Sequence, residues 1–212
     1  QGLRILVTAG PTKEYIDPVR YISNPSSGKM GYAVAKAAAM RGAKVTLVSG
    51  PVQCTAPEGV ELIPVISALE MYDAVMERVS NQDIIIKAAA VGDFRPQKVW
   101  DQKMKKDAIH TIELIKNPDI LQAVCEKKEE RIVIGFCMET QDLARQAYEK
   151  LLRKGADMIV ANNVAEPDSG FATDTNRVLF VYPDGTQKQL DTMPKEALAH
   201  QILDAAMKIQ VC

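Results

Sequence analysis

A near-continuous apolar run, Asp83-Ile-Ile-Ile-Lys-Ala-Ala-Ala-Val91, constrains the fold of this chain more than any other segment. A run of this length is typical of a strand in the middle of a parallel sheet, because such a strand is buried on both of its faces. Parallel strands are joined by crossover connections, which are usually helices, so the run predicts an α/β protein.

The rest of the sequence alternates between strand-like and helix-like segments, as that prediction requires. The expected strands are residues 3–7, 44–48, 60–65, 83–91, 111–116, 131–136 and 157–161. The expected helices open near Gly28, at the capping box Ser67-Ala-Leu-Glu70, at Asn117-Pro-Asp119 with Asn117 as the cap, near Leu143 and at Pro194. We therefore expect one domain over residues 1–212, built on a Rossmann-like, doubly wound, mainly parallel sheet.

A turn near the C-terminus predicts an antiparallel addition to that sheet. Pro183-Asp-Gly185 separates two strand-like segments, residues 177–182 and 186–190, which is the pattern of a β-hairpin.

Composition and charge exclude several classes of partner. The 212 residues have a formal net charge of −1, so bulk electrostatics would not hold nucleic acid or an anionic membrane. The apolar runs are too short to span a bilayer. The four cysteines are far apart and lack zinc-site spacing, and the two histidines have unrelated contexts, so we expect a cytoplasmic protein without a histidine-based metal site.

The stretch from Asp17 to Gly31 is expected to bind an anion. The first strand ends at Thr8-Ala-Gly-Pro-Thr12, and a polar loop leads to a helix whose first residues are small. The unpaired N–H groups and the positive dipole end of a helix start favour phosphate oxygens. Gly28 and Gly31 would let this helix pack closely on the strand.

Four loops should meet at this site. Ligands of doubly wound sheets bind beyond the carboxyl ends of the strands. The loops at residues 8–31, 91–107, 117–121 and 136–140 all leave from that edge.

Two motifs that suggest other nucleotide-binding proteins fail on inspection. Ser27-Gly-Lys29 resembles the end of a P-loop, but Met30 stands where Ser or Thr should hold magnesium. Tyr32 and Lys36 have the YxxxK spacing of short-chain dehydrogenases, but they fall in the first helix. There we expect a packed ring and a solvated lysine.

Several side chains at the expected edge have two interpretations each. Asp93 is either a ligand contact or a cap. Lys103 is either a solvated loop residue or an ammonium that closes over a polyphosphate. Phe136 is either core or a platform for a base. Lys150 and Lys154, four residues apart on one helix face, are either surface lysines or part of the site.

Together these pieces resemble the family of bacterial phosphopantothenoylcysteine synthetases, the C-terminal synthetase domain of bifunctional coenzyme A biosynthesis proteins. The matching strings, in order along nearly the whole chain, are Thr8–Thr12, Asp17–Arg20, Ser23-Asn24, Ser26–Gly31, Ala88–Phe94, Lys103–Lys106, Lys116–Ile120, Gly135-Phe136 and Glu139-Thr140. In many bacteria a flavin-dependent decarboxylase domain precedes this domain, and the strand that begins directly after Gln1-Gly2 is consistent with a domain cut from such a chain.

The resemblance implies a ligase that joins 4'-phosphopantothenate to L-cysteine with CTP and Mg²⁺. The substrate carboxylate attacks the α-phosphate of CTP to give an acyl-cytidylate and pyrophosphate, and the cysteine amine then displaces CMP. The resemblance also implies a homodimer. The Mg²⁺ would be held mainly by the CTP phosphates, and no protein ligand for it can be named from the sequence.

The resemblance also assigns roles to residues. Asn24 and Lys103 would be catalytic, Asn24 by contacting the acyl group and Lys103 by closing over the site on its loop. Phosphopantothenate would be held by Arg20, which reaches in from the second subunit, with Asn24, Ala89, Ala90 and Asp93. CTP would be held by Gly10, Ser27, Gly28, Ala88, Ala89, Asp93, Lys103, Pro118, Asp119, Ile120, Leu121, Phe136, Lys150 and Lys154.

Three positions depart from the family pattern, and two other functions stay open. Lys87 replaces an apolar or small residue, Gly92 replaces Ala or Ser, and Cys137-Met138 replaces two small residues. The alternatives are an NAD(P)-dependent oxidoreductase with a Rossmann fold and a non-catalytic nucleotide-binding domain. The choice of CTP over ATP rests on the resemblance, because backbone groups can select cytosine without a side-chain signature.

Overall fold

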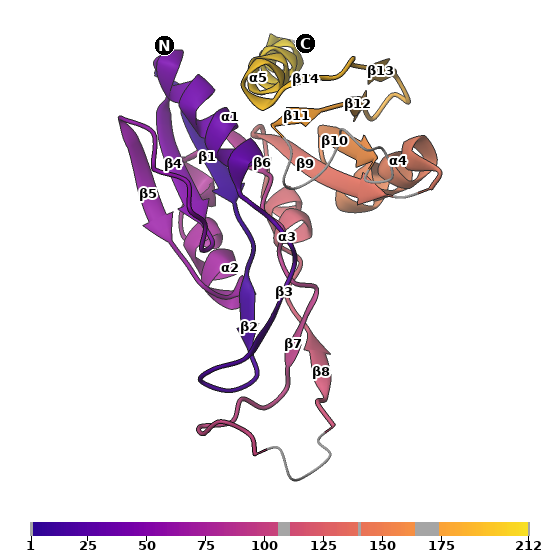
Figure 1. The fold of residues 1–212 in the computed structure, drawn as a ribbon. Coiled ribbons are helices and arrows are strands. Elements are labelled where there is room, and N and C mark those ends of the chain that lie inside the picture. The colour runs from indigo at the N-terminus through magenta and orange to yellow at the C-terminus, as the bar shows by residue number, and fades with distance from the viewer. Residues whose placement is uncertain (1, 106–110, 140, 164–173, 212) are drawn as a thin grey trace.

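The computed structural model describes residues 2–105, 111–139, 141–163 and 174–211, which form an eight-stranded sheet in the order β13-β12-β10-β9-β6-β1-β4-β5 (Figure 1). The strands are β1 (Arg4–Ala9), β4 (Lys44–Ser49), β5 (Val60–Pro64), β6 (Ile84–Lys87), β9 (Ile132–Glu139), β10 (Met158–Asn163), β12 (Val178–Val181) and β13 (Gln187–Gln189). The six from β5 to β10 in this order are parallel, and β12 and β13 pair antiparallel at one edge. The predicted parallel sheet and C-terminal hairpin are confirmed.

The apolar run at residues 83–91 forms the middle of the sheet, as predicted. Strand β6 lies between β1 and β9, and Ile84, Ile85 and Ile86 are buried. The strand is shorter than expected, because residues 88–90 leave the ladder with β9. They continue along the end of β1, where Ala90 N donates to the Gly10 carbonyl at 2.9 Å.

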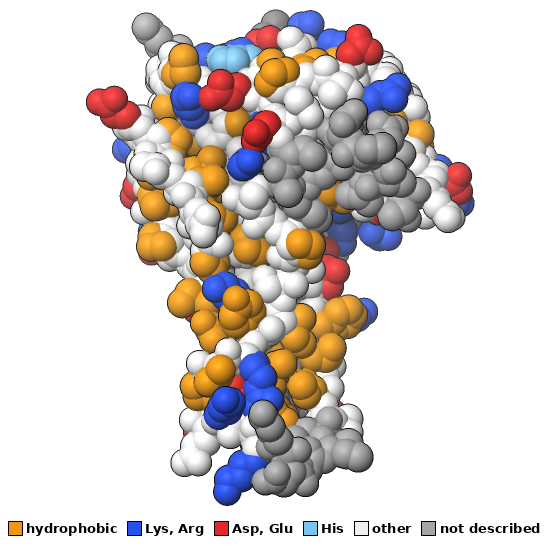
Figure 2. All heavy atoms as spheres, viewed as in Figure 1, with side chains coloured by type: hydrophobic (Ala, Val, Ile, Leu, Met, Phe, Trp, Pro, Cys, Tyr) orange, Lys and Arg blue, Asp and Glu red, His pale blue; other side chains and the backbone are white. Residues whose placement is uncertain are grey.

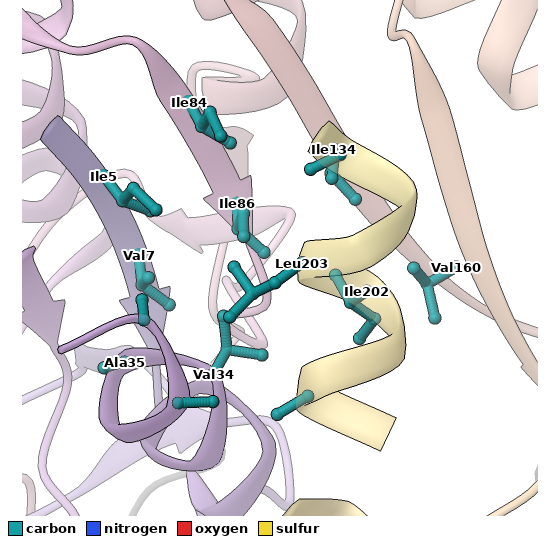
Figure 3. Packing of buried hydrophobic residues seen from close by; sticks show 14 of the residues in the cluster. Ile5, Val7, Val34, Ala35, Ile84, Ile86, Ile134, Val160, Ile202 and Leu203 are labelled. Carbon is teal, nitrogen blue, oxygen red and sulfur yellow. The ribbon is translucent and has the colours of Figure 1, made fainter. Parts of the chain in front are cut away.

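Helices cover both faces of the sheet, so the doubly wound prediction is also confirmed. On one face lie α1 (Lys29–Met40) and α5 (Lys195–Val211), and on the other lie α2 (Ala68–Met76), α3 (Ile120–Glu126) and α4 (Leu143–Lys154), with a short 3-10 turn, η1 (Val79–Asn81), before β6. Figure 3 shows the first layer: isoleucines and valines from β1, β6, β9 and β10 lie against the residues of α1 and α5. None of the helices among the described residues is long and apolar enough to cross a membrane.

Side chains cap the starts of α2 and α3. The capping box at α2 is present, because Ser67 Oγ accepts from Glu70 N at 3.2 Å and the Glu70 carboxylate accepts from Ile66 N at 2.8 Å. The predicted cap of α3 was wrong: the cap is Asp119, whose Oδ1 accepts from Gln122 N at 3.0 Å. Asn117 is instead held in the preceding loop by other partners.

Two short antiparallel ribbons project from the sheet as an arm (Figure 1). We define the arm as residues 13–23, which contain β2 (Lys13–Tyr15) and β3 (Tyr21–Ser23), with residues 94–105 and 111–116, which contain β7 (Phe94–Pro96) and β8 (Leu114–Lys116). A small further pair, β11 (Thr175–Asn176) with β14 (Met193–Pro194), lies beside α5.

The prediction that residues 111–116 form a strand of the main sheet was wrong. Only residues 114–116 are a strand, and they pair with β7 in the arm. The side chain of Leu114 is 48% exposed, so the apolar residues of this segment do not reach the core.

A buried carboxylate ties the two ribbons together. The Asp17 carboxylate accepts from the backbone N–H groups of Val19 and Arg20 at 2.8 Å and of Met104 at 3.2 Å, and it pairs with the Arg20 guanidinium at 2.6 Å. Burial alone would raise the pKa of Asp17, but the backbone donors and Arg20 outweigh it and lower the pKa to about 2.

We expect Asp17→Asn to loosen the arm at neutral pH. In the wild type the folded pKa is depressed, so the contribution of Asp17 to arm stability is full above its ordinary pKa of 3.8 and is lost as the pH falls towards about 2. The single tryptophan, Trp100, reports on this because its backbone N–H donates to the Ile16 carbonyl at 2.9 Å. Its fluorescence should change below pH 4 in the wild type, whereas the variant should show the altered emission already at pH 7. Identical emission of the two proteins at pH 7 would contradict the role of Asp17.

Candidate functional site

A cleft lies at the carboxyl ends of the central strands, where the connections that follow β1 and β6 lead to opposite sides of the sheet. After β1 the chain continues to β4 on one side, and after β6 it continues to β9 on the other side. Doubly wound proteins bind ligands in the crevice at such a point of the sheet. The cleft consists of two adjoining hollows of about 300 and 550 Å³. Both are lined by Lys87, Val91, Asp93, Phe136 and Lys150, so we treat them as one site, the edge cleft.

The smaller hollow opens onto the start of α1. The cap residue Gly28 has φ of 75°, offers no side-chain acceptor, and is followed by a first turn without an acidic residue, so the positive end of the helix is open to an anion. Gly31 permits close packing of α1 on β1, because a Cβ there would lie 2.5 Å from Ala9 Cβ. The predicted residues that line this hollow are Asn24, Ser27, Gly28, Ala88, Ala89, Ala90, Asp93, Phe136 and Lys150.

Asn24 sits at the rim of this hollow on the loop before α1. Its side chain is exposed, and Nδ2 donates to the Val91 carbonyl at 3.1 Å. The amide oxygen is the end that remains to meet a ligand.

The larger hollow is bounded by the start of α3 and by one face of α4. Lys150 Nζ donates to the Phe136 carbonyl at 3.0 Å, and Lys154 Nζ lies 2.5 Å from Asp119 Oδ2. Burial alone would raise the pKa of Asp119, but the hydrogen bonds from Lys154 and from the Gln122 backbone, together with the charges of Lys154 and Lys87, outweigh it and leave the pKa lowered. The predicted residues that line this hollow are Asp93, Pro118, Asp119, Ile120, Leu121, Phe136, Lys150 and Lys154.

Lys87 is a cleft residue that the sequence interpretation treated only as a departure from a family pattern. It closes β6, lines both hollows, and donates from Nζ to the Ala89 carbonyl at 3.2 Å. Its pKa is lowered to about 8, chiefly by burial and then by the charge of Lys150. The sequence feature that points to this cleft residue is a lysine within an otherwise apolar central strand.

Two further residues position the loops of the cleft. Thr12 Oγ1 accepts from Gly92 N at 2.9 Å. Asn117 Nδ2 donates to the Gly92 carbonyl at 2.8 Å, and its Oδ1 accepts from Arg95 at 2.9 Å. Both side chains therefore fix the turn that precedes Asp93.

Three predicted site residues do not line the edge cleft. Gly10 is buried behind it, where its carbonyl accepts from Ala90 N. Arg20 and Lys103 lie on the arm, where Arg20 also donates to the Met104 carbonyl at 2.8 Å and Lys103 is exposed. Lys106 and Thr140, which belong to the matching strings, lie outside the described residues.

The YxxxK pair lies away from the edge cleft. The ring of Tyr32 is buried and its hydroxyl contacts Ser49 Oγ at 3.2 Å, while Lys36 pairs with Glu196 at 2.7 Å. Both border another hollow of about 910 Å³ over α1, whose Lys29 is itself paired with Asp174. The expectation of a packed ring and a solvated lysine is confirmed.

A metal ion would find few protein ligands in the edge cleft. The described residues include no cluster of three or more His, Cys, Asp or Glu side chains arranged to hold a metal. The cleft offers two carboxylates, and Asp119 is already committed to Lys154 and Gln122. Asp93 is exposed at the shared wall and makes no ion pair with another described residue, so it fits a cation whose other ligands come from a substrate.

Comparison with known proteins identifies the family of the chain. A model of the DNA/pantothenate metabolism flavoprotein C-terminal domain matches residues 1–209. The coenzyme A biosynthesis bifunctional protein CoaBC of Bacillus subtilis (strain 168) is 48% identical over 205 residues, which are 96% of this chain and 50% of that protein. The protein of the same name from Escherichia coli (strain K12) is 48% identical over 207 residues, 95% of this chain and 51% of that protein.

A solved structure is similar over almost the whole chain. The C-terminal domain of a coenzyme A biosynthesis bifunctional protein CoaBC has a TM-score of 0.84 and 42% sequence identity, and the match covers 99% of this chain and 98% of that one. The chain thus spans about half the length of the curated relatives that it matches.

Proposed function

The chain belongs to the family of DNA/pantothenate metabolism flavoprotein C-terminal domains, and we propose that it is the ligase that joins 4'-phosphopantothenate to L-cysteine with CTP. The observation that supports this most is the edge cleft, in which an open helix start and several lysines meet at the carboxyl ends of β1 and β6. The names of the relatives place them in coenzyme A biosynthesis, which agrees with that reaction.

The first half-reaction replaces the phosphoanhydride bond of CTP with a mixed anhydride between the substrate carboxylate and the α-phosphate. A carboxylate oxygen of phosphopantothenate forms a bond to the α-phosphorus of CTP while the bond from that phosphorus to the bridging oxygen breaks, and pyrophosphate leaves with the electron pair. Negative charge that builds up on the phosphates is stabilised by Lys150 and the start of α1, while Lys154 lines the same hollow in its ion pair with Asp119. This step needs positioned charge rather than a strong base, so the cleft needs no histidine.

The second half-reaction forms the amide. The cysteine amine attacks the acyl carbon, the carbon–oxygen bond to phosphate breaks, and CMP leaves with that electron pair while the amine loses a proton to solvent. Asn24 lies at the rim of the smaller hollow, where it would contact the acyl group. Ala89, Ala90 and Asp93 would line the rest of the phosphopantothenate site.

Mg²⁺ would be held mainly by the CTP phosphates, with Asp93 as the carboxylate that the cleft leaves available. When bound there it would neutralise phosphate charge and orient the triphosphate. Phe136 would stack on the base, and backbone groups of residues 118–121 would read its hydrogen-bonding edge.

The exposed apolar side chains of the arm are the feature from which we infer a homodimer. Several of its apolar side chains are exposed on a narrow projection (Figure 2): Val19, Tyr21, Ile22, Phe94, Val99 and Leu114. Exposed apolar patches of this kind are typical of protein interfaces. A second copy of the chain would cover them, and it would bring Arg20 and Lys103 to the partner's edge cleft, because neither lines its own. In the full-length protein we propose a flavin-dependent decarboxylase as the other half.

Pyrophosphate release tests this function most directly. We expect release with CTP and phosphopantothenate, weaker release with ATP, and formation of the amide only when cysteine is added. Absence of release with either nucleotide would overturn the ligase proposal. Binding of NADPH without binding of CTP would support the oxidoreductase alternative instead.

Mixed dimers test whether Arg20 serves the neighbouring site. An Arg20→Ala protein and an Asn24→Asp protein should each be nearly inactive, yet a mixture that exchanges subunits should regain roughly a quarter of wild-type activity, because half of the dimers are mixed and each has one intact site. Circular dichroism of Arg20→Ala controls for loss of the ion pair with Asp17. A mixture that stays inactive although mixed dimers form would place Arg20 in its own subunit's site.

A further inference from the structure

We propose that Lys87 binds the polyphosphate of the nucleotide directly, and that loss of its proton weakens nucleotide binding. This inference rests on the proposed function for the identity of the nucleotide. It adds a substrate-binding residue at a position where the resemblance predicts none.

The position of Lys87 brings its ammonium to the wall that the two hollows share. It is the last residue of β6, at the carboxyl end of the sheet, and its Nζ donates to the Ala89 carbonyl at 3.2 Å. A ligand that spans both hollows must therefore pass this ammonium.

The ammonium groups of Lys87 and Lys150 carry two positive charges that no ion pair among the described residues balances. Lys154 is neutralised by Asp119, whereas Lys87 and Lys150 are each held by a neutral carbonyl oxygen and make no ion pair within the described part of the chain. Asp93 is the remaining carboxylate near them. Two ammonium groups with incomplete hydration and one exposed carboxylate form a site that an anion completes.

The pKa of Lys87 gives this site its pH dependence. The pKa is lowered to about 8, mainly by burial, then by Lys150, and with opposing contributions from Asp119 and Asp93. A phosphate oxygen beside the ammonium would raise that pKa, so binding takes up a proton above pH 8 and is weaker there. Below pH 7 Lys87 is already charged and affinity should be nearly independent of its titration.

Calorimetric titration with CTP and Mg²⁺, and separately with inorganic tripolyphosphate, tests the inference between pH 7 and 9.5. We expect the wild-type dissociation constant to rise about fivefold from pH 7 to 9, with uptake of about 0.4 proton per ligand at pH 8. Lys87→Met should bind about tenfold more weakly at pH 7, with neither the rise nor the proton uptake. Lys87→Arg should keep the affinity and lose the pH dependence. Lys44 is exposed at the amino end of β4, away from the cleft, so Lys44→Met should bind both ligands with the affinity and pH dependence of the wild type.

Each result is decisive for one of the two proposals. Lys87→Met with wild-type affinity and wild-type proton uptake would overturn the role of Lys87 and leave the ligase untouched. Tripolyphosphate binding that depends on Lys87, without pyrophosphate release from CTP, would support Lys87 as an anion ligand and refute the ligase.

Discussion

Asn24→Asp is expected to leave pyrophosphate release from CTP intact while slowing amide formation about a hundredfold or more, so that the acyl-cytidylate accumulates. The physical reason is local. Asn24 Nδ2 donates to the Val91 carbonyl at 3.1 Å, and a carboxylate cannot make that contact. It would also bring a second negative charge to a hollow that already contains Asp93, where the acyl group has to be held for attack by the amine.

Single-turnover experiments with labelled CTP separate the two halves of this prediction. The adduct of CMP with phosphopantothenate should be trapped in the variant in the presence of cysteine, and it should be consumed in the wild type. Asn81→Asp makes the same chemical change on an exposed residue of η1, before the amino end of β6, and should behave as wild type. Coupling to cysteine at the wild-type rate in Asn24→Asp would remove Asn24 from the second step.

The main sheet was predictable because its strands obey a strong local rule. Residues 84–86 and 132–134 are apolar on both faces, which is typical of a strand covered on both sides in a parallel sheet. From that pattern alone the loops at the carboxyl edge could be expected to meet, and Ser27, Asp93, Phe136 and Lys150 do line one cleft.

The arm was not predictable for the opposite reason. Its strands are three residues long, they contain Pro96 and two lysines, and most of their apolar side chains are exposed. Their stability comes from contacts between residues far apart in the sequence, such as the hydrogen bond from Met104 N to Asp17 Oδ2. No local sequence pattern predicts such contacts. Asn117 was misassigned similarly, because a cap and a loop bridge use the same residue type.

Gly50→Ala is expected to lower the free energy of unfolding by about 2–4 kcal/mol and to weaken nucleotide binding. A Cβ at this position would lie 1.7 Å from the Pro11 carbonyl oxygen and 2.8 Å from its carbon, so backbone rather than a flexible side chain must move. Pro11 is bridged to Ala90, and Ala90 N donates to the Gly10 carbonyl. The displacement is therefore transmitted to residues 88–90, which line the edge cleft.

Urea unfolding of Gly50→Ala beside Gly59→Ala distinguishes this steric effect from simple loss of a glycine. Gly59 has φ of 74°, and a Cβ added there would meet nothing within 4 Å, so alanine should cost only about 1 kcal/mol of backbone strain and leave CTP affinity unchanged. Equal shifts in the unfolding midpoint for the two variants would mean that the backbone at Gly10–Pro11 moves aside with little cost in free energy. In that case the end of β4 would not help to shape the cleft, and the wall formed by residues 88–90 would depend on β1 and β6 alone.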